Sequence, residues 1–370
     1  VRDPTGRQVL MASRGYRPVL DGVDLTLTMD RNVQSEAERI LREGIQANKA
    51  SSGNIVVLDA RTAAVLAMAN FPTSDPARYG WVERAEQYIN TSVSAIYEPG
   101  SVLKPLTLAA ALETRVIRAT DTYDDRGEII VANRRILNSD RRAHGLSTME
   151  DILAKSLNVG AAHVAIQLGP ARYYEMMRRF GLGEATGIDL AQEEIGIMRV
   201  PGDVDWHMSD LGANSYGQGI SLTPIQVASA YVALANGGLL MRPHVVREVR
   251  SSQGVEQRGP YRRVRVLSPD VSETITRMMV NAMERNMPQA MVPGFHFAGK
   301  SGTASIPDQE GYRAEHVIAS YAGFGPVPNP RFVILVKFDK PREGYWGGTV
   351  AAPEFARLAR WLVDYYGVSP

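Results

Sequence analysis

Strand-like segments lie near both ends of this chain, and the region between them is mostly helical. Residues with alternating or β-branched character occur at 24–29, at 53–69 around a turn, and near 295–301, 316–324 and 331–339. Strands drawn from both ends of a chain can meet only if the helical middle is an insertion between them. The pattern predicts an α+β fold, with an antiparallel sheet flanked by helices and a helical subdomain.

Helical periodicity and capping residues divide the middle of the chain into several helices. Two capping boxes are expected, Ser147-Thr-Met-Glu150 and Thr223-Pro-Ile-Gln226, because a hydroxyl and an acid or amide three residues later satisfy the first N–H groups. Residues 1–22 are expected to form turns with a hairpin, and 71–87 a loop. The expected helices are 32–47, 102–113, one ending at 156, 159–169, 171–180, one from 223 towards 236, one of about sixteen residues from 268, and 353–366.

The composition excludes several classes of function. The chain has 370 residues, a net charge of +1 and no cysteine, so thiol catalysis, disulfides and thiolate metal sites are ruled out. A charge near zero gives no electrostatic reason to expect a nucleic-acid partner. No apolar run reaches membrane-spanning length, and Val1 is not a natural start. We therefore expect an excised portion of a longer protein, from which a membrane anchor is missing.

Ser101 and Lys104 form the first candidate catalytic pair. They lie three residues apart at the start of an expected helix and therefore share a face. A serine hydroxyl needs an adjacent base to become a good nucleophile. Burial and a nearby cation, for which Lys300 is the candidate, would lower the pKa of Lys104 enough to make its amine that base. Taken alone, the same pair also describes a helix cap beside an exposed lysine.

Two further strings supply the other groups that such chemistry needs. Ser156 and Asn158 lie where one expected helix ends and another begins, and could relay a proton and hold a substrate carbonyl. Either residue could equally satisfy backbone groups at the helix end. Lys300-Ser-Gly-Thr303 follows an alternating segment, so substrate could lie along it as an added strand, with its carboxylate on Lys300, Ser301 and Thr303. Gly302 would permit a close approach of backbone, and the backbone N–H groups of Ser101 and Thr303 could form an oxyanion hole. Without substrate, the segment would be an edge strand protected by a lysine.

Lys300 also belongs to a second motif, which is typical of nucleotide-binding proteins. Residues 294–301 read G-F-H-F-A-G-K-S, which matches the phosphate-binding pattern G-x-x-x-x-G-K-[ST]. That motif requires a strand before it and a helix directly after it, whereas prolines lie on both sides here. Nucleotide binding therefore stays a distant alternative. The six histidines have no metal-ligand spacing, so we expect neither a metal site nor a cofactor.

Lysine is scarce, which makes the lysines in these strings noteworthy. Of 41 basic residues only six are lysine: Lys49, Lys104, Lys155, Lys300, Lys337 and Lys340. A lysine amine can lose its proton when it is buried, whereas an arginine stays charged. Two of the six lie in the candidate catalytic strings.

The three strings in this order resemble the penicillin-binding protein transpeptidases and the serine β-lactamases. Further segments resemble the class B penicillin-binding proteins in particular, and the stretch from Gly22 to Gln34 resembles the junction between their pedestal and catalytic domains. These segments are Tyr97-Glu-Pro-Gly-Ser101, Thr186-Gly-Ile-Asp-Leu190, Tyr216-Gly-Gln-Gly219 with Thr223-Pro224, Ala235-Asn-Gly-Gly238, and Gly347-Gly348 with Ala351-Ala-Pro353.

The resemblance implies a role for each candidate residue. Ser101 would be the acylated nucleophile, Lys104 its base and Ser156 the proton relay. The donor peptide would be held by Asn158, Lys300, Ser301, Gly302 and Thr303. The implied reaction is attack on a D-Ala-D-Ala bond of a peptidoglycan stem peptide and transfer to a neighbouring amine, with β-lactams as slow-leaving acylating agents.

The resemblance also implies an organisation and a setting. Residues 1–22 would be a remnant of the pedestal domain and linker, and 23–370 the transpeptidase domain. The protein would be anchored by an absent N-terminal helix at the outer face of a bacterial membrane, beside a glycan polymerase and division or elongation proteins. A β-lactamase or β-lactam sensor on the same fold is the nearest alternative. Deacylation in a β-lactamase needs a positioned base, for which Glu193 and Glu194 are the candidates, although the resemblance makes Glu193 structural.

Overall fold

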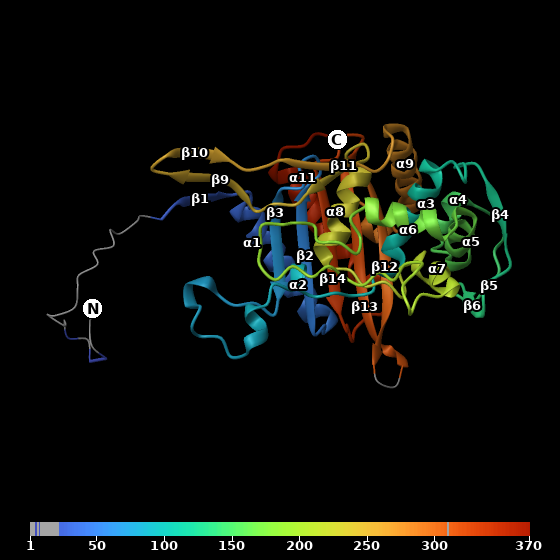
Figure 1. Cartoon of the computed structure of the whole chain (residues 1–370), viewed down its shortest axis with the longest axis horizontal. Helices are drawn as coiled ribbons and strands as arrows, with labels where there is room; N and C mark the ends of the chain where they lie inside the picture. The colour runs from blue at the N-terminus through green and yellow to red at the C-terminus, as the bar shows by residue number, and fades with distance from the viewer. Residues whose placement is uncertain (1–3, 6, 8–21, 309–310) are drawn as a thin grey trace.

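A five-stranded antiparallel sheet forms the centre of the molecule (Figure 1). The computed structural model describes residues 4, 5, 7, 22–308 and 311–370, so most of the turns expected in 1–22 lie outside the described residues. In spatial order the strands are β12 (His296–Asp308), β13 (Gly311–Val327), β14 (Phe332–Asp339), β2 (Ser52–Asp59) and β3 (Val65–Phe71). The pairing of β14 with β2 joins the two ends of the chain and confirms the antiparallel sheet predicted from sequence.

Helices cover both faces of this sheet because its strands are apolar on both sides. Helices α1 (Arg31–Asn48) and α11 (Ala352–Tyr365) pack on one face, against Ile55 and Val57 among others. Helix α8 (Pro224–Ala235) packs on the other face, and every residue from Pro224 to Leu234 is buried. Such all-round burial is typical of a helix enclosed between layers.

A helical subdomain lies beside the β12 end of the sheet (Figure 1). Its connections include two short hairpin-like sheets that the sequence analysis did not predict. The helices are α3 (Lys104–Glu113), α4 (Met149–Ala154), α5 (Asn158–Leu168), α6 (Pro170–Arg179), α7 (Met208–Asn214) and α9 (Pro269–Asn286). The strand pairs are β4 (Thr122–Asp125) with β7 (Gly145–Thr148) and β5 (Glu128–Val131) with β6 (Arg134–Leu137).

Several details differ from the sequence prediction. Strand β1 (Asp24–Leu27) joins a separate sheet with β9 (Val246–Ser251) and β10 (Gly254–Gln257), far along the chain. The capping box of α4 is formed by Thr148 and Asp151, one residue later than expected, whereas the box of Thr223 and Gln226 at α8 is confirmed. The remaining elements are β8 (Leu239–Arg242) with β11 (Tyr261–Arg265), α2 (Thr91–Ser94), α10 (Gly347–Val350) and short 3₁₀ turns at Pro76–Arg78, Ala85–Tyr88, Gly100–Leu103 and Pro288–Ala290.

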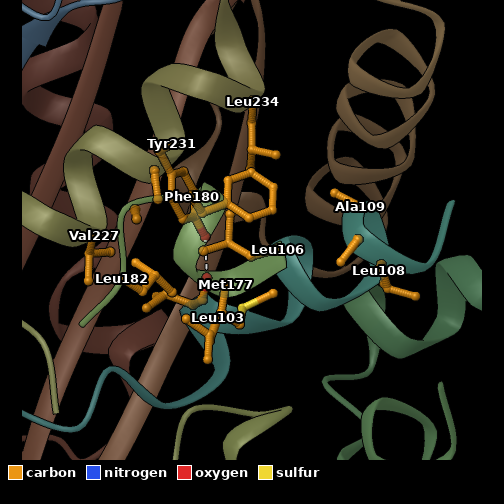
Figure 2. Packing of buried hydrophobic residues seen from close by; sticks show 14 of the residues in the cluster. Leu103, Leu106, Leu108, Ala109, Met177, Phe180, Leu182, Val227, Tyr231 and Leu234 are labelled. Atoms are coloured by element: carbon orange, nitrogen blue, oxygen red, sulfur yellow. Dashed lines mark hydrogen bonds between the residues drawn. The ribbon is translucent and has the colours of Figure 1, made fainter. Parts of the chain in front are cut away.

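A buried apolar cluster supports the segment that carries Ser101. Figure 2 shows Leu103 and Leu106 beside Met177, Phe180 and Tyr231, which come from α6, its C-terminal end and α8. The Tyr231 hydroxyl donates a hydrogen bond to the Val102 backbone oxygen at 2.7 Å. The turn before α3 is therefore held by packing and by a buried polar contact at the same place.

Close packing between α1 and the sheet generates a stability prediction at Gly44. A Cβ built on this buried helical glycine would lie 2.5 Å from the Phe338 ring. Replacing a helical glycine by alanine normally stabilises by about 0.5–1 kcal/mol, but overpacking a core costs about 1–3 kcal/mol. We expect Gly44→Ala to lower the free energy of unfolding by about 1 kcal/mol or more in urea titrations.

The exposed position Gln46 on the same helix provides the control. Gln46→Ala should change stability by less than about 0.5 kcal/mol, as is usual for surface sites. A stabilised Gly44→Ala protein would show that the Phe338 ring yields without cost, contrary to the prediction.

Candidate active site

Ser101 lies in a tight turn whose position is fixed by backbone contacts. Residues Gly100–Leu103 form a 3₁₀ turn that leads directly into α3, and Gly100 has a left-handed φ of 60°. The Gly100 N–H donates to the Gly217 carbonyl at 3.0 Å. A Cβ on Gly217 would lie 2.1 Å from the Gly100 oxygen, so only glycine fits there. The sequence prediction that Ser101 lies where a helix begins is confirmed.

Lys104 extends its amine from the first turn of α3 towards the end of α4. The side chain is fully buried, and Nζ lies 2.6 Å from the Ser156 carbonyl oxygen and 2.8 Å from Asn158 Oδ1. A longer contact of 3.2 Å joins it to Ser156 Oγ. Ser156 has a left-handed φ of 56°, a conformation that a non-glycine residue rarely adopts. This strained turn carries the carbonyl to which Lys104 donates.

Burial and a neighbouring cation act together on the Lys104 amine. Desolvation lowers the pKa of Lys104 well below its ordinary value, and the positive charge of Lys300 lowers it further. Burial also lowers the pKa of Lys300, to about 8. Both amines therefore lose their protons more readily than an exposed lysine does, in the direction expected from burial and from the neighbouring cation.

The Lys300–Thr303 segment lies on β12, which is an edge strand of the sheet. Gly302 is opposite Ser320 in the register, and a Cβ on Gly302 would lie 2.7 Å from the Pro99 oxygen. The close backbone approach expected at Gly302 is therefore made by the segment that leads to Ser101. Thr303 Oγ1 accepts a hydrogen bond from the Gly347 N–H at 2.9 Å, which leaves the hydroxyl hydrogen as a donor.

A cleft of about 350 Å³ brings the predicted hydroxyl groups together. Its lining includes Ser101, Ser156, Ser301 and Thr303, which come from three separate parts of the chain. Lys104 and Lys300 are 0% and 5% exposed and do not line the cleft themselves, but each contacts a residue that does: Lys104 Nζ lies 3.2 Å from Ser156 Oγ, and Lys300 Nζ lies 3.1 Å from the Ser301 oxygen. The structure thus brings the hydroxyl groups of all three strings to one cavity, with the two buried lysines behind them.

The Asn158 side chain contacts Lys104 on one side and strand β6 on the other. Its side-chain carbonyl accepts from Lys104, and its amide nitrogen donates to the Leu137 carbonyl at 3.0 Å. Asn158 is not among the residues that line the cleft. Its side-chain oxygen is therefore already occupied by Lys104, and the expectation that its amide binds substrate stays a prediction.

Several cleft residues were not identified from the sequence. Asn138, Ser139 and Asp140 come from the loop after β6, and Trp346 and Thr349 come from the segment around α10. The Asp140 carboxylate lies 2.9 Å from His144 Nε2. No local pattern marks these residues, because only the pairing of distant elements brings them to the cleft.

The alternative sites proposed from sequence lack the required geometry. Residues 296–301 belong to β12, which continues as a strand to Asp308, so the helix that a phosphate-binding loop needs is absent. Glu193 accepts hydrogen bonds from the Thr186 and Gly187 N–H groups, and neither it nor Glu194 lines the cleft. Within the described part of the chain, no group of three potential ligands is arranged to hold a metal ion.

The chain matches one family model and many individual relatives. Residues 53–360 match the model of the penicillin binding protein transpeptidase domain. The penicillin-binding protein PbpB of Mycolicibacterium smegmatis is 33% identical over 96% of this chain and 56% of the relative. Stage V sporulation protein D of Bacillus subtilis is 33% identical over 100% of this chain and 58% of the relative.

Solved structures agree with the sequence matches. Penicillin-binding protein 3 of Mycobacterium tuberculosis in complex with aztreonam superposes with a TM-score of 0.88, at 30% identity over 96% of this chain and 82% of that one. The apo transpeptidase domain of Burkholderia pseudomallei penicillin-binding protein 3 gives a TM-score of 0.81, at 28% identity over 93% of this chain and 97% of that one.

The fold and the cleft define an α+β protein in which a serine and a buried lysine three residues apart lie at the start of one helix beside a cavity. The comparisons then identify the family: the chain belongs to the penicillin-binding protein transpeptidase domain family. It spans a little over half the length of the curated relatives, 56% and 58% of the two named. Among the described residues, no helix is long and apolar enough to cross a membrane.

The unusual environments of two lysines generate a prediction for titration. With six lysines in the chain, ¹³Cε-lysine NMR should resolve each signal. We expect one signal to titrate near pH 8, where the pKa of Lys300 lies, and another, that of Lys104, well below the ordinary lysine range. The physical reason is desolvation of the charged form of both amines.

Single substitutions assign the two signals. Lys300→Met should remove the signal near pH 8 and move the Lys104 midpoint upwards, because it deletes a neighbouring positive charge. If no lysine signal titrated below pH 10, the proposed ionisation of the site would be wrong.

Proposed function

We propose that this chain is the catalytic domain of a peptidoglycan D,D-transpeptidase that works through an acyl-enzyme on Ser101. The observation that carries the proposal is the buried amine of Lys104, which comes from the helix that Ser101 precedes and whose pKa is lowered by burial and by Lys300. This arrangement supplies the base that a serine nucleophile needs. Family membership supports the substrate class, since one relative is named peptidoglycan D,D-transpeptidase FtsI homolog.

The proposed acylation step uses these groups in turn. Ser101 Oγ attacks the carbonyl carbon of the penultimate D-Ala, and its proton passes to the Lys104 amine. The oxyanion is stabilised by the backbone N–H groups of Ser101 and Thr303. The proton then returns through the Ser156 hydroxyl to the departing nitrogen, the C–N bond breaks, and D-Ala leaves.

The second half of the reaction reverses these roles. An amine on a neighbouring stem peptide attacks the ester on Ser101 and loses its proton to the Lys104–Ser156 pair. The ester C–O bond breaks, the proton returns to Ser101 Oγ, and the new peptide cross-link is released. General acid–base catalysis of this kind contributes typically about 10²–10⁴-fold in rate.

Substrate binding uses the edge of the sheet. The donor peptide adds alongside β12 as a further strand, and its terminal carboxylate is bound by Lys300, Ser301 and Thr303. Gly302 keeps this strand close to the nucleophile turn. Lys300 binds the carboxylate best below about pH 8, where it keeps its charge.

The names of the relatives support a cellular setting. These names refer to penicillin binding, peptidoglycan D,D-transpeptidation and sporulation. We place the domain at the outer face of the cell membrane, carried by an N-terminal anchor. A glycan polymerase and proteins of division or elongation are its expected partners, and residues 1–22 are the expected remnant of a pedestal domain.

The first test concerns the nucleophile and its base. Ser101→Ala should abolish the covalent adduct with benzylpenicillin in intact-mass spectrometry. Lys104→Arg keeps a cation in place of the amine but cannot serve as a base, so the second-order acylation rate should fall by about 10²-fold or more. An adduct on Ser101→Ala would mean that another residue is the nucleophile, and a normal rate in Lys104→Arg would remove Lys104 as the base.

The second test separates transpeptidase from β-lactamase. The only carboxylate that lines the cleft within the described residues is Asp140, which already contacts His144, so no positioned base is evident for hydrolysis of the acyl-enzyme. We expect the penicilloyl adduct to persist for many minutes, with nitrocefin consumed in near-stoichiometric amounts. Multiple rapid turnovers of nitrocefin would instead identify a β-lactamase.

A further inference from the structure

A third lysine is buried beneath the active site, and none of the steps above uses it. Lys337 lies on β14 and is 5% exposed. Its Nζ lies 2.6 Å from Oδ1 of Asp339 and 3.3 Å from Oδ1 of Asn54. The same nitrogen lies 5.2 Å from the centroid of the Tyr97 ring, within the range of a cation–π contact. Removing the Lys337–Asp339 ion pair from water costs free energy. Apolar residues at these two positions would therefore make the protein at least as stable.

The strand register places Lys337 in a polar row that crosses the whole sheet. Successive partners in this row, from β12 to β3, are Gly302, Ser320, Lys337, Asn54 and Asn70. The next row on the same face begins at Lys300. Its other members are all apolar: Ala322, Leu335, Val56 and Met68. Directly paired residues share a face of a sheet. Lys337 therefore lies on the face that carries Lys300 and Gly302.

The far end of this row is tied to α2. Asn54 Nδ2 donates to Asn70 Oδ1 at 2.6 Å and to Thr91 Oγ1 at 2.7 Å, while the Ser92 hydroxyl donates to Asn70 Oδ1 at 2.7 Å. Helix α2 is the last regular element before the segment that leads to Ser101. The hydrogen-bonded group of Lys337, Asp339, Asn54 and Asn70 is thus connected to the part of the chain that precedes Ser101.

Tyr97 provides the direct connection to the nucleophile turn. It lies four residues before Ser101, is buried, and pairs through its backbone with Leu222 in both directions, at 2.9 and 2.8 Å. Its hydroxyl has no hydrogen-bond partner among the described residues. Burial and the Asp339 carboxylate raise the pKa of that hydroxyl. The ring is therefore held by packing in the apolar cluster and by the Lys337 ammonium over its face.

We propose that Lys337 is a positioning residue for acylation of Ser101. Asp339 compensates its charge, and the Lys337 ammonium holds the Tyr97 ring so that the Tyr97–Ser101 segment keeps one position above the sheet. Lys337 touches neither substrate nor the reacting atoms. This inference rests on the proposed acylation of Ser101 and adds to it a residue that acts on the chain before Ser101, whereas Lys104 follows Ser101 in the sequence.

The test measures the binding of benzylpenicillin and the acylation of Ser101 separately. In Lys337→Met/Asp339→Asn both charges are removed together, so no unpaired charge is left in the core. Stopped-flow acylation by benzylpenicillin gives the dissociation constant of the first complex and the acylation rate constant separately. We expect the rate constant to fall between about 10-fold and 100-fold, as for a misplaced reacting group, with the dissociation constant within about twofold of the wild type.

Matched variants show whether the effect passes through Tyr97. Tyr97→Leu should cause a similar loss of rate, and adding it to the Lys337/Asp339 variant should cause little further loss. Tyr97→Phe keeps the ring face and should recover most of the rate lost in Tyr97→Leu. Lys49→Met removes an exposed lysine that pairs with Glu343 and serves as the control for loss of a surface ion pair.

An unchanged acylation rate constant would overturn the inference. A second contrary result would be a smaller fraction of protein that becomes labelled, with the labelled molecules reacting at the normal rate. That result would indicate that Lys337 has a structural role only. If the double variant did not fold, the pair Tyr97→Leu and Tyr97→Phe would decide the question. A wild-type chain that forms no adduct would instead refute the proposed function and, with it, this inference.

Discussion

An amine enclosed in the protein interior is the feature on which the rest of the active site depends. Lys104 has no exposed surface, and it donates to the Ser156 carbonyl and to Asn158 rather than to a carboxylate. These neutral acceptors stabilise its charged form less than a carboxylate would, so burial and the positive charge of Lys300 still lower its pKa. The left-handed turn at Ser156 and the buried packing of α3 hold the amine in this environment.

The sheet contributes a second constraint, which is an open edge. Strand β12 ends the five-stranded sheet and carries Lys300 on one face, while its outer edge faces the cleft. An exposed edge is normally a liability for aggregation. Here three elements pack against β12: helix α9, the 3₁₀ turn Gly100–Leu103 and the segment around Gly347. The edge is therefore accessible to an extended peptide but poorly accessible to another sheet.

Much of this architecture could be read from the sequence, and the failures have physical causes. The antiparallel sheet, the capped helix at Thr223 and the convergence of Ser101, Lys104, Ser156 and Lys300 were predicted because periodicity and short motifs report local structure. The pairing of β1 with β9 was not, because nothing in either segment specifies a partner more than two hundred residues away. The contribution of Asp140 to the cleft and the burial of Lys337 depend in the same way on tertiary contacts alone.

The walls of the cleft consist partly of backbone packed directly on backbone. A methyl group on Gly347 would lie 2.1 Å from the Gly302 oxygen, and one on Gly217 would lie at the same distance from the Gly100 oxygen. No side chain can be introduced at these places without moving the nucleophile or the strand beside it. These positions therefore leave little freedom for sequence change, whereas the exposed cleft residues Trp346 and Asp140 can vary without displacing either backbone segment.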